Sequence, residues 1–328
     1  MKKQLSVAIA SLMFAPVFVQ ADPTLYGKAN VSYASTKSET DGQESESVEE
    51  LASNASRIGV KGSEEISDGL KGIYQAEFEV YFDDGESSGK TFKQRNIFVG
   101  IEGDFGTVIA GHFDTPLKQA QKKVDLFNDL YGDIKNSMTV NDNRESNSIM
   151  YSTPDLSGFR LYADLISSED ADNSNGTSIA ATYENGGFYA ALAYDLDVEY
   201  EEIEVDGETV DQNDSSAVRA VIQYSFGDFQ LGLLGEEYEN INKEKNSGIL
   251  GSVKYKLGDF ALKGQFGQSD IKEQDATTLS LGVDYKLSKA SKLFAFYTQN
   301  SHVAEVTDAG VEIEQDDTFA GVGVEVKF

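Results

Sequence analysis

The sequence of 328 residues contains no cysteine, no tryptophan, only two histidines and only four prolines. Without cysteine the chain has no disulfide framework, no Cys-ligated zinc, no iron–sulfur cluster and no thiol nucleophile. Two histidines are too few for a histidine-based metal centre, and we expect neither a metal nor a cofactor. Basic residues are also scarce, since 27 Lys and Arg stand against 56 Asp and Glu, a net charge of −29. This balance argues against a nucleic-acid partner, because duplex binding requires a basic face.

The N-terminus has the pattern of an export signal. Two lysines are followed by an apolar run, Leu5–Val19, and then by an alanine before an aspartate. A positive start, an apolar stretch shorter than a bilayer span and a small residue before a polar one are typical of a secretory signal peptide. A membrane anchor is the alternative, but it needs about twenty uninterrupted apolar residues, and a serine and a proline interrupt this run. We expect residues 1–21 to be cleaved and residues 22–328 to form a single domain.

The remaining chain alternates apolar and polar residues with a period of two, as β-strands do. The alternation is clearest over 25–33, 159–165, 218–226 and 279–287, whereas helical periodicity is confined to Leu117–Leu130. Tight Gly-Asp-Phe turns divide the strands at one end, and longer polar connections join them at the other. The expected loops are 37–55, 83–91, 116–144, 168–176, 198–215, 239–247, 270–275 and 302–317. The pattern predicts about sixteen antiparallel strands joined by about eight turns and eight loops.

Strands of this kind fit a soluble sandwich or a transmembrane barrel. A sandwich buries one apolar face of each sheet, whereas a barrel turns its apolar face to lipid and its polar face to a water-filled lumen. Strands of about ten residues, aromatic residues at strand ends and unequal loop lengths favour the barrel. Closure also removes open edges, for which lipid offers no hydrogen-bond partner. We therefore predict an all-β fold, a transmembrane antiparallel β-barrel of about 16 strands.

Four segments resemble general (non-specific) trimeric porins of the Gram-negative outer membrane. They are LYGK at 25–28, SRIGVKG at 56–62, the region 95–111 around a GDFGT turn, and GVGVEVKF at 321–328. The resemblance covers the whole mature chain and implies a homotrimer in the outer membrane, in contact with lipid and lipopolysaccharide. It implies a third external loop folded into the pore as a constriction. It also implies that the C-terminal strand ending in Phe328 is the signal read by the outer-membrane assembly machinery.

The longest loop, Pro116–Arg144, is the clearest functional candidate, because a connection of this length in a compact fold is usually functional. It mixes apolar residues with carboxylates and can form a short helix with its apolar side against the wall. We expect Asp125, Asp129 and Asp133 to face the pore. An ordinary surface loop with incidental charges is the alternative.

Strand parity and the resemblance place basic side chains on the wall opposite this loop. They are Lys28, Arg57, Lys61, Arg95 and Arg144. Our hypothesis is a transverse field between these cations and the loop aspartates, because rings of charge select ions and low-dielectric walls focus the field. The alternative is that each arginine pairs with a local carboxylate such as Glu77 or Glu79. Both arrangements can hold at once.

These features predict a channel for passive diffusion of ions and small hydrophilic solutes. The acidic loops 38–50 and 195–214 predict a preference for cations, with bound divalent cations there as an open alternative. We expect no enzyme, because neither His112, at the start of the third loop, nor His302 has a motif for a catalytic triad. A substrate-selective porin for sugar or phosphate and a non-conducting surface receptor or adhesin are the alternative functions.

Overall fold

The structure of the protein is a computed structural model. It describes residues 23–41, 43, 46–85, 89–169, 174–198, 201–205, 208–212, 214–306 and 310–328, with side chains at all of these except 46, 201–205 and 208–212. The expected signal peptide, residues 1–21, lies outside the described residues. So do the side chains of most of the second acidic loop.

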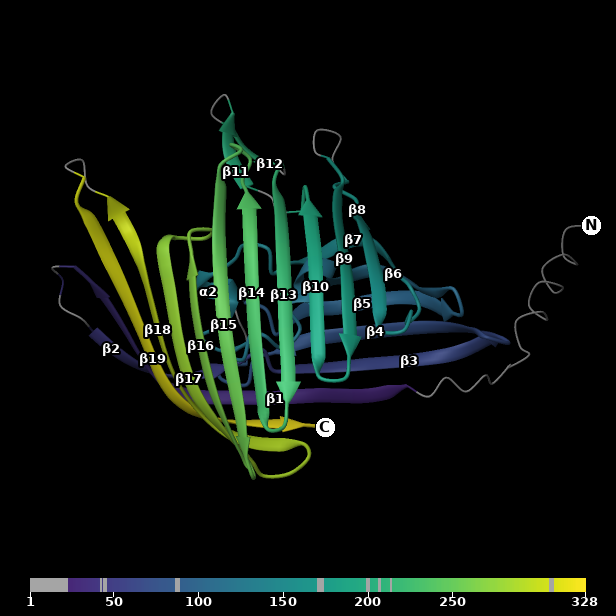
Figure 1. Ribbon diagram of the computed structural model, residues 1–328, viewed down its shortest axis with the longest axis horizontal. Helices are drawn as coiled ribbons and strands as arrows, with labels where there is room; N and C mark the ends of the chain where they lie inside the picture. The colour runs from purple at the N-terminus through teal and green to yellow at the C-terminus, as the bar shows by residue number, and fades with distance from the viewer. Residues whose placement is uncertain are drawn as a thin grey trace, which may run out of the picture.

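Seventeen strands form one antiparallel sheet that closes on itself (Figure 1). They are β1 (Thr24–Thr40), β2 (Glu46–Ser53), β3 (Arg57–Ser67), β4 (Leu70–Val80), β5 (Phe92–Gly103), β6 (Gly106–Asp114), β7 (Arg144–Ser152), β8 (Phe159–Ile166), β9 (Gly176–Asn185), β10 (Phe188–Leu196), β13 (Ser216–Phe226), β14 (Phe229–Glu239), β15 (Lys245–Leu257), β16 (Phe260–Ser269), β17 (Gln274–Lys286), β18 (Ser291–Val306) and β19 (Glu312–Lys327). Pairing of β1 with β19 closes the barrel. A separate hairpin of β11 (Glu201–Val205) and β12 (Glu208–Gln212) rises from the connection between β10 and β13.

The barrel has sixteen strand positions, because β2 and β3 act as one interrupted strand. Both pair with β1, β2 with its later part and β3 with its first residues. The interruption spans residues 54–56, where Ala55 has a positive φ of 47° and the Ser56 hydroxyl bonds the backbone of Asn30. The predicted transmembrane antiparallel β-barrel of sixteen strands is confirmed.

The beginning of β1 and the C-terminal residue meet at the short-turn end of the barrel. The backbone of Gly27 donates to the carbonyl of Phe328 at 2.9 Å, and Phe328 donates back to Gly27 at 3.1 Å. A Cβ on Gly27 would lie 2.3 Å from the Phe328 ring, so only glycine admits this contact. The pairing of β1 with β19 at this end takes the place of the eighth turn that the sequence predicts.

Two predicted loops are largely strand. β1 and β2 remain paired out to Ser38↔Glu46, and β18 and β19 out to Val306↔Glu312. The expected loops 37–55 and 302–317 are therefore too long. Both faces of these extensions carry polar residues, so the alternation that marks a membrane-facing strand is lost there although the backbone pairing continues.

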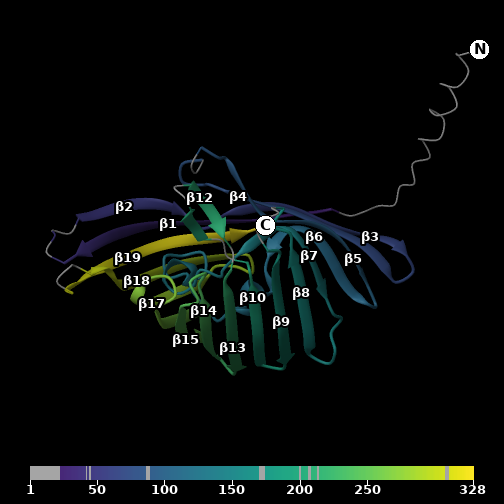
Figure 2. The same cartoon turned by 90° about the horizontal axis from the view of Figure 1, so that it is seen from above.

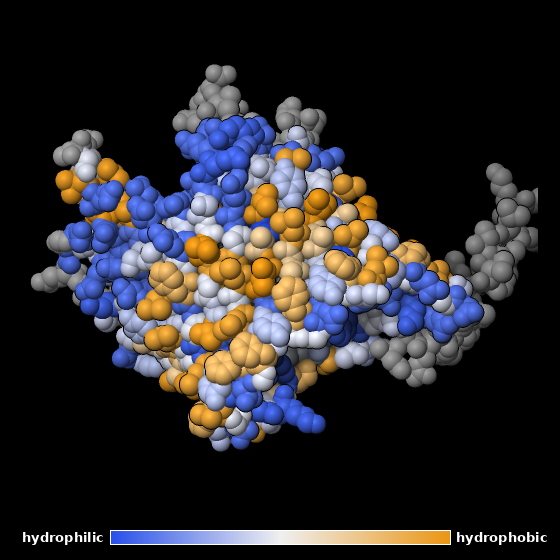
Figure 3. Space-filling view, viewed as in Figure 1, coloured by the Kyte–Doolittle hydropathy of each residue, from blue (hydrophilic) through white to orange (hydrophobic). Residues whose placement is uncertain are grey.

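Apolar side chains cover the outside of the barrel. On β13, Val218, Ile222 and Tyr224 are exposed while Arg219 and Val221 are buried, the parity that the sequence predicts. Figure 3 shows apolar residues as a broad band across the strands, with hydrophilic residues above and below it. This is the distribution that a lipid bilayer requires.

Aromatic rings gather at the short-turn end, as the Gly-Asp-Phe turns predict. Phe229 stacks on Tyr255 with ring centroids 4.5 Å apart, and Phe260 lies 4.8 Å from Tyr285. Paired rings at strand ends form the aromatic belt typical of a membrane interface.

The connection between β6 and β7 folds inward. This segment, residues 115–143, is called the inner loop; it carries α1 (Pro116–Ala120) and α2 (Ile134–Ser137) and lies within the ring of strands in the view of Figure 2. Its apolar side packs on the lumen face of β9, β10 and β13–β17. The helix expected over Leu117–Leu130 is limited to α1, because Lys122 and Asp129 adopt positive φ and break the turn sequence. No helix in the described part of the chain is long and apolar enough to cross a bilayer.

Candidate pore constriction

The inner loop lies against the wall where the strands carry glycine. Val124 and Phe127 are fully buried. A Cβ on Gly232 would lie 2.9 Å from the Val124 side chain, and one on Gly282 would lie 2.9 Å from the Phe127 ring. Glycine at these lumen-facing positions thus lets the loop approach the backbone of β14 and β17.

Arg219 of β13 ties both arms of the inner loop to the wall. Its guanidinium is completely buried and pairs with Glu236 of β14 at 2.5 Å. It also donates to the Leu117 carbonyl at 3.3 Å and to the Thr139 hydroxyl at 3.2 Å. The Thr139 hydroxyl in turn donates to Glu236. A single buried ion pair therefore holds the beginning and the end of the loop.

Asp129 of the inner loop contacts the opposite wall of the lumen. Its carboxylate accepts from Lys28 Nζ at 2.6 Å and from Arg57 Nη2 at 2.5 Å. Burial alone would raise the pKa of Asp129, but Arg57 and Lys28 outweigh burial and lower the pKa to about 2. The bridge between loop and wall is therefore fully charged at neutral pH.

The break between β2 and β3 aims Arg57 at the loop. Its Nε donates to the carbonyl of Ala55 at 3.0 Å, the residue with positive φ in the break. Irregularities of this kind often redirect a side chain next to a functional site. The guanidinium reaches Asp129 and also lies 3.9 Å from the Glu77 carboxylate on the wall.

The other two arginines of the wall pair with neighbouring carboxylates. Arg95 contacts Glu77 at 2.9 Å and Glu79 at 3.1 Å. Arg144 contacts Asp114 at 2.7 Å. The structure therefore combines local pairing with one contact, through Asp129, between wall and loop.

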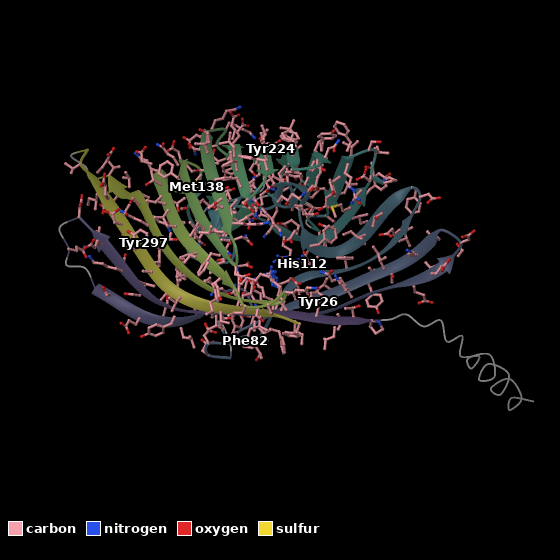
Figure 4. All side chains as sticks on the ribbon, turned by 60° about the horizontal axis from the view of Figure 1, so that its bottom comes forward. Tyr26, Phe82, His112, Met138, Tyr224 and Tyr297 are labelled. Carbon is pink, nitrogen blue, oxygen red and sulfur yellow. The ribbon has the colours of Figure 1, made fainter. Side chains whose placement is uncertain are left out.

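A cavity of 530 Å³ lies between the inner loop and the wall of β3–β7. Its cationic lining consists of Arg57, Lys93, Arg95, Lys118, Lys122, Lys135 and Arg144. Its carboxylates are Glu79, Asp114, Asp129, Asp133, Asp142 and Glu145. Figure 4 places His112, another lining residue, on the inner side of the barrel wall. Charges of both signs thus face a water-accessible space inside a closed barrel.

Comparison with known proteins identifies the family. Residues 8–304 match the family described as Gram-negative porin. The chain is a Gram-negative porin. This confirms the family that the sequence resembles, and with it the outer membrane as the location.

Individual relatives of this porin share a modest part of its sequence. It is 35% identical to the major outer membrane protein P.IB of Neisseria gonorrhoeae over 59% of the chain and 56% of that relative. It is 26% identical to outer membrane porin protein 32 of Delftia acidovorans over the full length of both. The anion-selective porin from Comamonas acidovorans has a similar structure, with a TM-score of 0.75 and 24% identity over 94% of this chain and 100% of that one. The alignment to the gonococcal relative thus spans little more than half of that protein.

Two of the three aspartates expected to face the pore accept hydrogen bonds from the backbone of the inner loop, and of these two only Asp133 lines the cavity. Asp125 accepts from the backbone of Phe127 at 3.0 Å and of Ile134 at 3.2 Å. Burial, together with the nearby Asp133, raises the pKa of Asp125. Asp133 caps α2 and accepts from the backbone of Asp129 at 2.8 Å, with 1% of its surface exposed. Both carboxylates satisfy backbone N–H groups of a loop with little regular structure, a need that the sequence does not reveal.

Two further residues of the porin, Lys61 and His112, differ from expectation. Lys61 lies four residues from Arg57 along β3, above the Tyr26 ring at 5.2 Å, and does not line the cavity. Lys28 contacts Asp129 of the loop, as the hypothesis has it, but does not line the cavity. His112 belongs to β6, not to the loop. Its Nδ1 lies 2.9 Å from the Ser146 hydroxyl, its ring also bonds the backbone of Glu145, and the Asp114 carboxylate acts on it through its charge.

The buried ion pair of Arg219 and Glu236, called the clamp, is not among the predictions from the sequence, although the strand register indicates that the two residues are neighbours. The turn at Gly227–Asp228 joins β13 to β14 with Phe226 opposite Phe229. Counting outward from this turn places residues 219 and 236 directly opposite each other on the lumen face, as observed. What the count does not show is that a distant loop covers the pair.

Proposed function

We propose that this porin is a passive channel for ions and small hydrophilic solutes. The observation that carries the proposal is the cavity of 530 Å³, lined by charged side chains, inside a barrel with an apolar exterior. Fixed charges at a narrow point select and orient solutes without a chemical step. The proposed working residues are the wall cations Arg57, Arg95 and Arg144 and the loop carboxylate Asp129.

We propose a preference for cations, supported by the net charge of −29. Carboxylates at the outer mouth raise the local cation concentration, most strongly at low salt, where screening is weak. Anion preference is the second candidate, because the cavity itself has one more cationic than anionic group among its described lining. A structural neighbour described as anion-selective has the same fold.

We also propose a homotrimer embedded in lipid and lipopolysaccharide. The family supports the trimer, and the outer face of β1 and β17–β19 carries an apolar groove of 570 Å³ that a protein neighbour can fill. Insertion by the assembly machinery through the C-terminal strand is supported by the position of Phe328, which closes the barrel against Gly27.

Conductance of the refolded protein in a planar bilayer tests the function. We expect stepwise openings in groups of three. Under a KCl gradient, the sign of the reversal potential distinguishes cation from anion preference. Silence from folded protein, verified by circular dichroism, would contradict a diffusion channel and favour a receptor or adhesin.

A further inference from the structure

Lysines face one another on the lumen wall between the inner loop and the short turns. In the register of β15 and β16, Lys254 lies directly opposite Lys263. In the register of β17 and β18, Lys286 lies directly opposite Lys292. Like charges in directly opposed positions destabilise a sheet. Two such pairs on adjacent hairpins therefore lower the stability of the barrel.

Few carboxylates compensate these lysines. Asp284 contacts Lys263 and Lys292, each at 3.0 Å, and Glu325, which lies opposite Lys292, pairs with Lys327 at 3.1 Å. The charges of Lys254 and Lys286 are left without an ion pair among the described residues.

The inner loop adds to the same cluster. Lys254 is repelled by Lys256, by Lys263 and by Lys123 of the inner loop, and it is attracted by Asp284. Lys263 is nearly buried, with its ammonium 4.8 Å above the Phe127 ring. The cluster thus begins directly beneath the loop that narrows the lumen.

Water reaches this cluster. Lys256 and Lys286 are exposed. A cavity of 250 Å³ opens near the turn that joins β17 to β18, and its charged lining consists of Lys286, Lys289, Lys292 and Lys327 with Asp259, Asp284 and Glu325. A solute in this half of the lumen therefore meets ammonium groups on two adjacent hairpins.

We propose that this lysine wall is a binding subsite for anions carrying two or more charges, of the phosphate or polycarboxylate class. The lysine wall is defined as Lys123, Lys254, Lys256, Lys263, Lys286 and Lys292. A multivalent anion relieves the repulsion within each opposed pair, and lysine binds phosphate well as a point charge. The subsite lies on the short-turn side of the constriction, which is the periplasmic side of such barrels. The inference rests on the proposed open lumen.

Side-dependent block of single-channel current by pyrophosphate tests the proposal. With ionic strength matched by KCl, we expect pyrophosphate to reduce the current from one side of the bilayer only. The double variant Lys254→Gln/Lys286→Gln should need at least about tenfold more pyrophosphate for half block, about 1.4 kcal/mol or more of binding free energy. Lys254→Arg/Lys286→Arg should keep the block.

A matched control is Lys245→Gln, at the outer end of the same strand β15. It should leave the block unchanged. Equal block of the wild-type protein and the double glutamine variant, block from both sides alike, or no block of a conducting channel would overturn the lysine wall. Absence of any conductance would instead contradict the proposed channel.

Discussion

Two ion-paired sites hold the inner loop, and they differ in how completely water is excluded. Arg219 and Glu236 are fully buried, with additional hydrogen bonds to Thr139 and to the Leu117 carbonyl. Asp129 and its partners Lys28 and Arg57 are partly exposed, and Asp129 and Arg57 line the cavity. Removing one partner of a buried pair leaves an uncompensated charge, which costs far more than loss of an exposed pair. The two sites therefore respond differently to mutation.

Arg219→Leu should destabilise the barrel by about 3–5 kcal/mol, because Glu236 stays buried without its cation. Thermal unfolding followed by circular dichroism measures the loss. The double variant Arg219→Leu/Glu236→Leu removes both charges and should recover most of the stability. Equal stability of the single variant and the wild-type protein would show that the clamp contributes nothing.

The contribution of Asp129 should depend on pH only in strong acid. A carboxyl whose pKa is lower in the folded state stabilises fully above its unfolded pKa, and that stabilisation disappears as the pH falls through the folded pKa. The pKa of Asp129 falls from 3.8 to about 2, which corresponds to about 2 kcal/mol. The stability difference between the wild-type protein and Asp129→Asn should be constant from pH 7 to 5 and disappear towards pH 2. A difference that already closes between pH 7 and 5 would contradict the bridge.

At the scale of elements, the inner loop fits the wall because the wall strands carry glycine where the loop carries apolar side chains. Val124 and Phe127 pack onto Gly232 and Gly282, and Met138 packs onto Gly267, where a Cβ would lie 2.6 Å from its sulfur. Because of this fit, the loop lies against β9, β10 and β13–β17, and the cavity remains between the loop and β3–β7. The packing of the loop against these glycines therefore determines how wide the opening next to β3–β7 is.

Gly282→Ala should push the loop into the opening. The added methyl would lie 2.9 Å from the Phe127 ring, and overpacking of this kind costs about 1–3 kcal/mol. We expect a smaller single-channel conductance, restored by adding Phe127→Leu. Gly251→Ala is the control, because no atom lies within 4 Å of the added methyl. A conductance equal to that of the control would mean that the loop is not held against β17.

The strands were predictable from the sequence because each residue of a barrel strand faces either lipid or water, so period-two alternation survives through β13 or β17. The inner loop was predictable only in its existence and inward direction. Nothing in the sequence distinguishes Asp125 and Asp133 from Asp129. Asp125 and Asp133 accept hydrogen bonds from backbone N–H groups, whereas Asp129 contacts Arg57. That difference depends on backbone turns at Lys122 and Asp129. No local pattern encodes such turns.

For the whole molecule, charge is distributed unevenly along the lumen. Carboxylates are concentrated in the outer loops, both signs meet at the constriction, and lysines dominate the wall of β15–β18 below it. The apolar outer band confines this gradient to one water column. An ion that moves along the lumen therefore passes a negative, then a mixed and then a positive electrostatic environment.

Thiol modification of a single introduced cysteine tests the water column most directly, because the chain has no cysteine of its own. Asn128 is exposed on the inner loop and lines the cavity, whereas Ile222 is exposed on the outer face of β13. In a planar bilayer, a charged methanethiosulfonate reagent should lower each conductance step of Asn128→Cys and leave Ile222→Cys unchanged. An unaltered conductance of Asn128→Cys, with modification verified by mass spectrometry, would contradict a conducting path between the inner loop and the wall.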